Sequence, residues 1–317
     1  MTIYKEKQLV YDKTGSEIDF IYGVAQEKLY RYAEEGRMNR KIVFLDIDGT
    51  LTESGSNRSP GSALRAVRQA RTRGHLVFLC SGRNYAMLSP LLDYGFDGVA
   101  ASAGGYVECG GEIIFDCPMT EEQRLRALKV FADNGVFRTV ECRDASYTDE
   151  SFQEYLREHI TEGRNRELLR KRVALEEALR MLPMRQYREE PVYKVVFMSP
   201  CQERLVKPWE MLKEDFTFWM QEEKGDCFIS GELMNRKFHK GQAVERVCRH
   251  LGIDRCDSLA FGDSMNDREM LETAGCGICM GNGSPALKEL ADDVCPPVGK
   301  EGLYRAFLKY GLITDGE

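Results

Sequence analysis

The sequence of 317 residues lacks any apolar stretch that approaches the roughly eighteen residues of a membrane span. Its first residues also lack the apolar segment of a secretory signal peptide, so we expect a cytoplasmic protein. The formal net charge is −7, which is only a small excess of acidic over basic residues. This small acidic balance gives no electrostatic reason to expect nucleic acid or an anionic membrane as a partner.

Disulfide-framework spacing is absent as well. The eleven cysteines are an odd number and are scattered through predicted strands and helices, which is typical of reduced thiols in a cytosolic protein. Cys276 and Cys279 have the spacing of a redox or metal motif, but they lie in an apolar run and have no second pair. We therefore interpret them as small core residues and not as zinc ligands.

The composition, with 43% hydrophobic and 30% charged residues, is that of an ordinary globular protein. The length allows a large core and a second domain. Between residues 41 and 117, strand and helix patterns alternate. Strands are expected at 42–45, 75–80 and 99–102, a helix at 62–70, and a hairpin-like stretch across 104–111. This βαβ order predicts an α/β fold, a Rossmann-like core with a parallel sheet.

From about residue 118 the pattern changes to that of an α+β insert. Its expected elements are helices at 120–135 and 201–215, a charged helical segment within 151–181, and strands at 137–142, 192–198, 216–220 and 227–233. The α/β pattern then resumes with helices at 240–251 and 267–273 around a strand at 258–261. We therefore predict a core of residues 39–117 and 237–317 with residues 118–236 inserted as a separate domain.

Residues 1–38 form an N-terminal extension with two possible patterns. Alternation around a turn at 13–16 suits a hairpin, while Ile18, Ala25 and Leu29 also fit one stripe of a helix. We favour a hairpin followed by a short helix that ends at Gly36.

Two of the predicted strands end abruptly in acids. Residues 42–45 run into Asp46 and Asp48, and residues 258–261 run into Asp263 and, four residues later, Asp267. In a parallel sheet, ligands bind beyond the carboxyl ends of the strands. Four carboxylates converging there would repel one another unless a divalent cation neutralised them, which points to Mg²⁺ and a phosphorylated ligand.

An aspartate can attack phosphorus directly and form an aspartyl-phosphate that water later hydrolyses. Asp46, at the strand end, is the expected nucleophile. Asp48 lies two residues on and projects from the same side of an extended chain, so it can give a proton to the leaving alkoxide and take one from the attacking water. Gly49 permits the tight turn that follows.

These residues resemble the four motifs of the haloacid dehalogenase-like (HAD) phosphohydrolases. The matching segments, in order, are Asp46–Thr52 (motif I), Ser81 within 79–83 (motif II), Lys240 within 238–241 (motif III) and residues 262–267 (motif IV). The resemblance covers roughly residues 39–310, and residues 280–282 and 291–294 also match its Cof-like branch.

The resemblance implies a role for each motif residue. The Ser81 hydroxyl would hold the phosphoryl group, Lys240 would neutralise charge on the nucleophile and the phosphoryl group, and Asp263 would bind Mg²⁺. The implied catalytic residues are Asp46 and Asp48. The implied phosphate or substrate contacts are Ile47, Ser81, Gly82, Arg83, Lys240 and Asn266. The implied metal ligands are Asp46, Asp48, Asp263 and Asp267.

About 160 residues separate Ser81 from Lys240, which is far more than a crossover connection needs. In this superfamily, an insert at that position implies a C2-type cap, and its α+β composition resembles the C2B form of the Cof-like branch. Such a cap would close over the active site and read the part of the substrate beyond the phosphate.

Several of these residues also have a purely structural interpretation. Ser81 can N-cap a helix, Asp267 can cap the helix that follows it, and Lys240 can be a surface lysine. Arg83 can contact the substrate or pair with a nearby acid. These alternatives stay open at the level of sequence.

We expect a Mg²⁺-dependent phosphatase of small phosphorylated metabolites, such as sugar phosphates or phosphorylated cofactors. A phosphohexomutase-like phosphotransferase and a non-catalytic HAD-fold binding module are the alternatives. Haloalkanoate dehalogenation fits worse, because it needs neither a general acid at Asp48 nor a Mg²⁺ site at Asp263. The sequence indicates neither the individual substrate nor the oligomeric state.

Overall fold

The computed structural model describes residues 40–54, 56–152, 181–221 and 229–315. The expectations for residues 1–38 and for 153–180 lie outside these ranges. The chain divides into two units, residues 1–40 and residues 41–317, and the fold described is that of the second unit.

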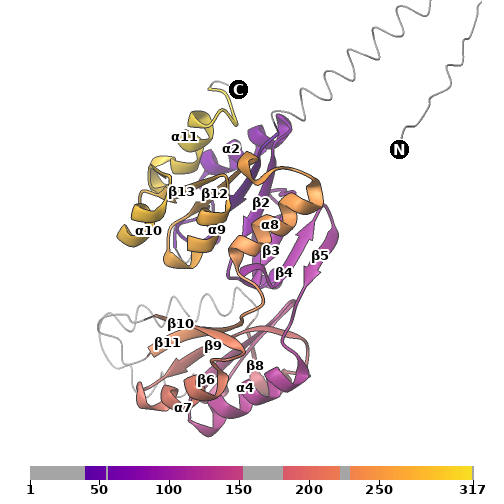
Figure 1. The fold of residues 1–317 in the computed structure, drawn as a ribbon, viewed down its shortest axis with the longest axis vertical. Helices are drawn as coiled ribbons and strands as arrows, with labels where there is room; N and C mark the ends of the chain where they lie inside the picture. The colour runs from indigo at the N-terminus through magenta and orange to yellow at the C-terminus, as the bar shows by residue number, and fades with distance from the viewer. Residues whose placement is uncertain (1–39, 55, 153–180, 222–228, 316–317) are drawn as a thin grey trace, which may run out of the picture. The chain divides into compact units, whose positions relative to one another are not determined.

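Eight strands form the first sheet, in the order β14-β13-β12-β1-β2-β3-β4-β5 (Figure 1). The strands are β1 (Ile42–Leu45), β2 (Leu76–Cys80), β3 (Gly98–Ala101), β4 (Tyr106–Cys109), β5 (Glu112–Asp116), β12 (Ser258–Gly262), β13 (Cys276–Met280) and β14 (Asp293–Cys295). The pairs from β14 to β3 are parallel, as predicted, whereas β4 and β5 pair antiparallel at one edge. This edge hairpin is the one expected across residues 104–111.

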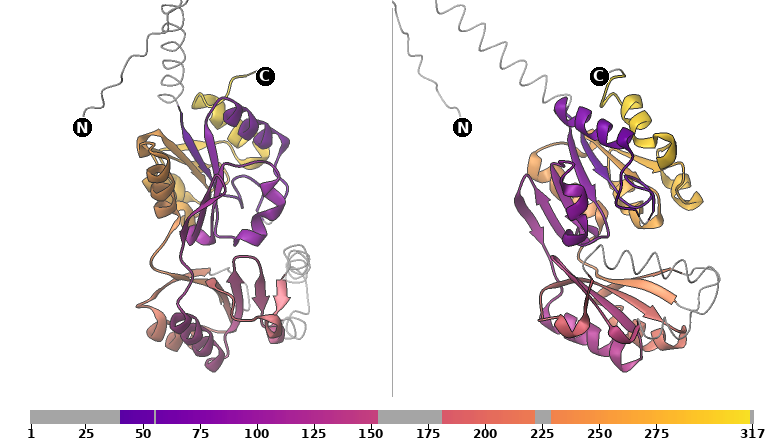
Figure 2. Two further views of the ribbon diagram at one scale, coloured as in Figure 1. Left: turned by 90° about the vertical axis from the view of Figure 1, so that its right-hand side faces the viewer. Right: turned by 180° about the vertical axis from the view of Figure 1, so that it is seen from behind.

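Helices cover both faces of this sheet, as Figures 1 and 2 show. One layer consists of α2 (Gly61–Thr72), α3 (Tyr85–Leu92) and α11 (Gly302–Lys309), and the other of α8 (Lys240–Leu251), α9 (Arg268–Thr273) and α10 (Pro285–Leu290). Because side chains alternate along a strand, Val43 and Leu45 pack with the first layer and Ile42 and Phe44 with the second. A strand buried on both faces explains the continuous apolar runs in the sequence.

The inserted segment forms a six-stranded sheet in the order β10-β11-β9-β6-β7-β8. Its strands are β6 (Phe137–Cys142), β7 (Ser146–Thr148), β8 (Met181–Pro183), β9 (Val192–Ser199), β10 (Phe216–Gln221) and β11 (Ile229–Asn235), and its helices are α4 (Glu121–Asp133) and α7 (Glu203–Leu212). Thr120 caps α4 in a capping box with Gln123. The sheet packs against these helices through an apolar cluster that includes Val140, Val195 and Leu233.

The other face of this second sheet carries charged and aromatic side chains. The register pairs Glu141 with Lys194, Lys194 with Met234, and Trp219 with Glu232. Since residues two apart on a strand share a face, these five side chains all lie on the side opposite the apolar cluster. The sheet therefore has a core side and a polar side.

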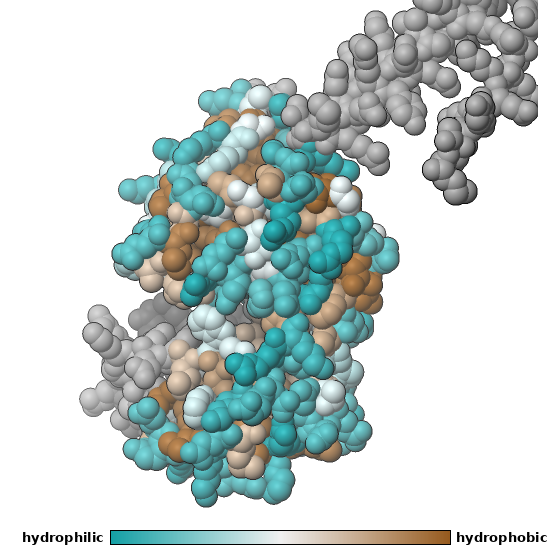
Figure 3. Space-filling view, viewed as in Figure 1, coloured by the Kyte–Doolittle hydropathy of each residue, from teal (hydrophilic) through white to brown (hydrophobic). Residues whose placement is uncertain are grey.

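No helix of the described residues is both long enough and apolar enough to cross a membrane. The face in view in Figure 3 is mostly hydrophilic with scattered apolar side chains, as is normal for a protein surface. The ten cysteines in the described ranges are all free. Cys279 is buried in one of the two apolar clusters of the core, and Cys276 packs against the other. Both positions agree with their interpretation as core residues.

Candidate active site

The acids predicted from the sequence emerge at neighbouring strand ends. Asp46 follows β1 and Asp263 follows β12, and these two strands are paired in parallel. The strand order reverses at this position, because the chain continues from β1 to β2 on one side and from β12 to β13 on the other. Such a switch point is where open α/β sheets bind ligands.

Lys240 is the first residue of α8, and its side chain is 1% exposed. The Nζ atom donates to Oδ1 of Asp46 at 2.7 Å and to Oδ1 of Asp267 at 2.5 Å. Burial alone would lower the pKa of Lys240, but the two carboxylates raise it above its usual value. Lys240 is therefore a buried, charged group, and its interpretation as a surface lysine is wrong.

The three acids around Lys240 crowd one another. Burial, and then the charge of Asp267, raises the pKa of Asp46 to about 8, although Lys240 opposes this. Burial and Asp267 also raise the pKa of Asp263 to about 6. One carboxylate oxygen from each of Asp46, Asp263 and Asp267 lies within 4.8 Å of the others. Since oxygens on opposite sides of one Mg²⁺ are roughly 4.2 Å apart, this set fits a single Mg²⁺ after a small contraction.

Two glycines allow these acids to come together. Gly49 has φ +84°, and a Cβ atom there would collide with the carboxylate of Asp263. A Cβ on Gly262 would meet Cβ of Asp267 at 2.5 Å. Oδ2 of Asp267 also accepts from the backbone N–H groups of Asp263 and Ser264, at 3.0 and 3.1 Å. Asp267 thus has a capping role as well as its bond to Lys240.

Asp48 does not join this carboxylate cluster. Its side chain is 42% exposed and accepts two hydrogen bonds from Arg83, at 2.7 and 2.8 Å. Asp46 and Asp48 nevertheless line the same cavity, and the chain turns after Asp46, with Thr50 N–H bonding the carbonyl of Ile47 at 3.2 Å. Asp48 is therefore not one of the three acids whose oxygens lie together, and its role as a metal ligand stays a prediction, whereas Arg83 adopts its predicted acid-pairing alternative.

The other predicted phosphate contacts lie close to this cluster. Ser81 follows β2, is 2% exposed, and accepts a 3.2 Å hydrogen bond from the N–H of Arg83. The Ile47 side chain is fully buried in the core, so only its backbone can reach a ligand. Gly82 and Asn266 line the same cavity as Asp46 and Ser81. Helix α3 is N-capped by Asn84 and not by Ser81.

This catalytic cavity has a volume of about 440 Å³. Besides the core residues already described, it is lined by Glu141, Lys194 and Glu232 from the polar face of the second sheet. Lys194 is 3% exposed, and its Nζ lies 2.8 Å from Glu232 Oε1 and 3.2 Å from Glu141 Oε2. The same Nζ donates to the carbonyl of Gly82 at 2.8 Å. Burial would lower the pKa of Lys194, yet the two glutamates raise it, so the ammonium is charged.

These inserted residues and Asn84 were not predicted from the sequence. Asn84 is fully buried, and its Nδ2 donates to the carbonyl of Cys142 at 2.8 Å and to Ser146 Oγ at 3.0 Å. A signal existed for Lys194, because it is a charged residue within the apolar run of β9. No comparable signal marks Glu141 or Glu232.

The family model for haloacid dehalogenase-like hydrolases matches residues 43–307. The protein YkrA of Bacillus subtilis is 28% identical over 87% of this chain and 100% of its own length. The HMP-PP phosphatase of Serratia proteamaculans is 30% identical over 79% of this chain and 87% of its own length. The solved structure of a haloacid dehalogenase-like hydrolase from B. subtilis is 25% identical, with a TM-score of 0.68 over 85% of this chain and 99% of that one.

The chain therefore belongs to the haloacid dehalogenase-like hydrolase family. Within it, the protein is a phosphatase of the Cof-like branch, with the α+β cap inserted between motifs II and III.

Proposed function

We propose that the protein hydrolyses phosphate monoesters of small metabolites with Mg²⁺, through an aspartyl-phosphate on Asp46. The observation that supports this most is the position of Lys240, whose ammonium bonds Asp46 and Asp267 at 2.7 and 2.5 Å in a fully buried site. A fixed positive charge next to a nucleophilic carboxylate is what the approach of an anionic phosphoryl group requires.

In the first step, a carboxylate oxygen of Asp46 attacks phosphorus and the bond to the leaving oxygen breaks. Asp48 gives its proton to the leaving alkoxide. In the second step, Asp48 takes a proton from water as the water oxygen attacks phosphorus, and the aspartyl bond breaks to release inorganic phosphate. Ser81, Gly82, Asn266 and the backbone of Ile47 hold the phosphoryl oxygens.

Arg83 controls when Asp48 can act. In the structure the guanidinium holds both oxygens of Asp48, at 2.7 and 2.8 Å. For Asp48 to donate a proton, Arg83 must leave at least one of these oxygens. A bound phosphoryl group offers the guanidinium another anion, so substrate binding itself would release Asp48.

Mg²⁺ would be held by the carboxylates of Asp46, Asp263 and Asp267, the group whose oxygens lie within 4.8 Å of one another. Hard oxygen ligands in this arrangement are those that Mg²⁺ prefers. When bound, the ion neutralises negative charge on the phosphoryl oxygens and on the acids. Lys240 contributes the second positive charge.

The substrate class follows from the size of the cavity and from the relatives. A cavity of about 440 Å³ is within the usual range for small-molecule sites. A relative at 30% identity is named for HMP-PP, a small phosphorylated molecule. We therefore propose small phosphorylated metabolites of this size as substrates.

The test is a phosphate-release assay on a panel of phosphorylated metabolites, with Mg²⁺ and with excess chelator. We expect Mg²⁺-dependent release by the wild type and essentially none by Asp46→Asn, because an amide cannot form the acyl-phosphate. Release that is equally fast in chelator would exclude the Mg²⁺ requirement. Release by purified Asp46→Asn would exclude the covalent mechanism.

A further inference from the structure

Lys194 of the cap bonds the backbone next to Ser81, a proposed contact of the phosphoryl group. Its Nζ atom donates to the carbonyl oxygen of Gly82 at 2.8 Å. Gly82 directly follows Ser81, and both residues line the catalytic cavity. A buried charge of the inserted domain is thus attached to the segment of the core that is expected to hold phosphate.

The core itself holds the carbonyl groups on either side of Gly82. The N–H of Ala103 donates to the carbonyl of Ser81 at 2.8 Å, and the N–H of Ser102 donates to that of Arg83 at 2.7 Å. Ala103 and Ser102 have φ +57° and +50°, a strained conformation that persists only where the surrounding structure determines it. Of three successive carbonyl groups, the first and third are therefore held by the core and the middle one by the cap.

The bond from Lys194 fixes the orientation of one peptide group. That group contains the C=O of Gly82 and the N–H of Arg83, which point in opposite directions because the peptide is trans. The N–H of Arg83 donates to Oγ of Ser81 at 3.2 Å. Lys194 and Ser81 therefore bond the two sides of the same peptide group. A charged donor at the carbonyl also polarises the N–H, since linked hydrogen bonds strengthen one another.

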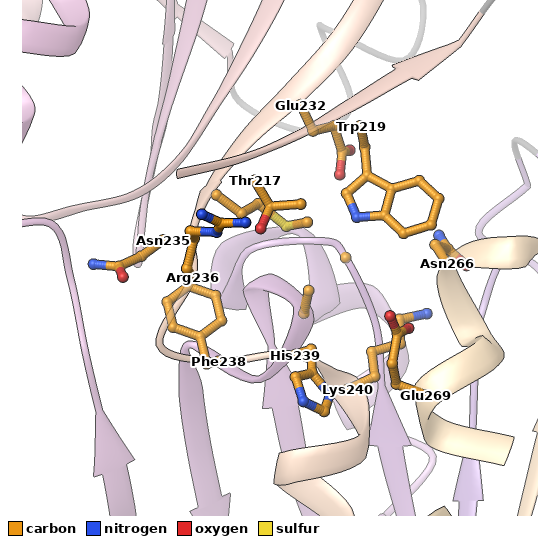
Figure 4. A pocket seen from close by; sticks show the side chains of 13 residues that line it. Thr217, Trp219, Glu232, Asn235, Arg236, Phe238, His239, Lys240, Asn266 and Glu269 are labelled. Atoms are coloured by element: carbon orange, nitrogen blue, oxygen red, sulfur yellow. The ribbon is translucent and has the colours of Figure 1, made fainter. Parts of the chain in front are cut away.

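Two glutamates direct the ammonium of Lys194 toward this carbonyl. An ammonium has three N–H groups, and three oxygens surround this one, those of Gly82, Glu232 and Glu141, at 2.8, 2.8 and 3.2 Å. The glutamates lie on β11 and β6, the two strands that flank β9. Figure 4 shows Glu232 extending from β11 toward a cavity that Lys240 of the core also lines. With one acceptor for each N–H group, Lys194 is placed to act on the backbone and not on the substrate.

A second set of bonds keeps the cap at this position. Nδ2 of Asn84 donates to the carbonyl of Cys142 and to Oγ of Ser146, at 2.8 and 3.0 Å. The N–H of Ala86 donates to the carbonyl of Arg143 at 2.9 Å. Residues 82–86, which directly follow Ser81, are therefore a segment on which the cap docks.

We propose that Lys194 is a positioning residue, which orients the Gly82–Arg83 peptide when the cap is docked and so directs the Ser81 hydroxyl at the phosphoryl group. Because Oγ of Ser81 accepts from Arg83, its O–H is left to donate to a phosphoryl oxygen. This inference rests on the proposed phosphatase function and adds a role of the cap in binding phosphate itself, whatever the leaving group.

The first test is a double-mutant cycle in kcat/KM. Lys194→Met alone would leave Glu141 buried without its ion-pair partner, so all variants carry Glu141→Gln, and Glu141→Gln alone is the reference. Ser81→Ala should lower kcat/KM about tenfold or more, the usual loss of a hydrogen bond to a charged group. Lys194→Met should lower it by no more than this, and should cause no further loss when added to Ser81→Ala. Losses that multiply, or no loss from Lys194→Met, would overturn the proposal.

The second test separates the positioning of phosphate from recognition of the leaving group. Orthovanadate resembles phosphate and has no leaving group, so its inhibition constant should rise by a similar factor in Ser81→Ala and in Lys194→Met. The loss of kcat/KM in Lys194→Met should also be similar for p-nitrophenyl phosphate and for glycerol 3-phosphate. An unchanged inhibition constant, or a loss confined to one ester, would contradict a role of Lys194 in phosphate binding.

The third test requires no turnover. Hydrogen–deuterium exchange followed by mass spectrometry should be faster in the peptide that contains residues 81–86 when Lys194 is replaced by methionine, because one anchor of this backbone is lost. The matched control is Tyr193→Phe. Tyr193 is the preceding residue of β9, is also buried, and bonds Asp116 at the end of β5 at 2.5 Å. This variant should leave exchange in residues 81–86 unchanged. Equal acceleration in both variants would show that any loosening of the cap suffices and that Lys194 has no specific role.

The outcomes separate the two proposals. Phosphate release by the wild type together with multiplying losses in the cycle would overturn the positioning role and leave the phosphatase function standing. Failure of the wild type to hydrolyse any ester would overturn the proposed function, and the positioning role in catalysis with it.

Discussion

Replacing Lys240 with methionine tests whether its ammonium holds the acidic cluster together. Methionine keeps most of the side chain's length and apolar volume but removes the charge that bonds Asp46 and Asp267 at 2.7 and 2.5 Å. Breaking a buried ion pair by removing one partner costs about 3–5 kcal/mol, because the remaining charge is left uncompensated. We expect Lys240→Met to lose about this much stability and, for a unit of this size, about 6–20 °C in Tm.

The matched control is Lys41→Met. Lys41 also forms a 2.5 Å ion pair, with Asp257, but these two side chains are 36% and 41% exposed. An exposed pair contributes about 0–1 kcal/mol, so this variant should unfold close to the wild type. Thermal unfolding followed by circular dichroism in Mg²⁺-free buffer measures both. Equal shifts in Tm for the two variants would contradict this role of Lys240, as would phosphate release by Lys240→Met at the wild-type rate.

Three further predictions concern the acids and the turn between them. Asp263→Asn should raise the Mg²⁺ concentration needed for half-maximal activity, and an unchanged titration would show that the cation is held elsewhere. Asp48→Asn should lose on the order of a hundredfold or more in the burst rate with an alkyl phosphate, but much less with p-nitrophenyl phosphate, whose leaving group needs no proton. Equal losses would mean that Asp48 is not the general acid. Gly49→Ala should displace Asp263 and weaken activity, whereas Gly74→Ala, also at positive φ but with open space around it, should stay active. Similar activity in both variants would show that the contact of Gly49 with Asp263 is unimportant.

Much of the core could be predicted because its signals are local. A continuous apolar run followed at once by Asp46 defines a buried strand and places the acid at its end, and the structure agrees for β1 and β12. The helix predicted at residues 240–251 has these bounds in the structure, and Lys240 starts it. The order and spacing of the motifs predicted an insert between Ser81 and Lys240, and the second sheet lies in that segment.

The polar face of the cap could not be predicted, because it depends on non-local register. Glu141, Lys194 and Glu232 come from three different strands and meet only when β6, β9 and β11 pair. Nothing local in the sequence indicates which residue of one strand lies opposite which residue of another. The pairing of Asp48 with Arg83 is also non-local, because Arg83 lies 35 residues away in the chain.

The most direct test of the account is the site of phosphorylation during turnover. Wild-type protein mixed with a good substrate is quenched in acid within one turnover, and its peptides are analysed by mass spectrometry. The covalent mechanism predicts a phosphate group on the peptide that contains Asp46, located on that residue, and its absence from Asp46→Asn treated in the same way. Turnover without any covalent phosphate, or with phosphate on another residue, would contradict the central claim.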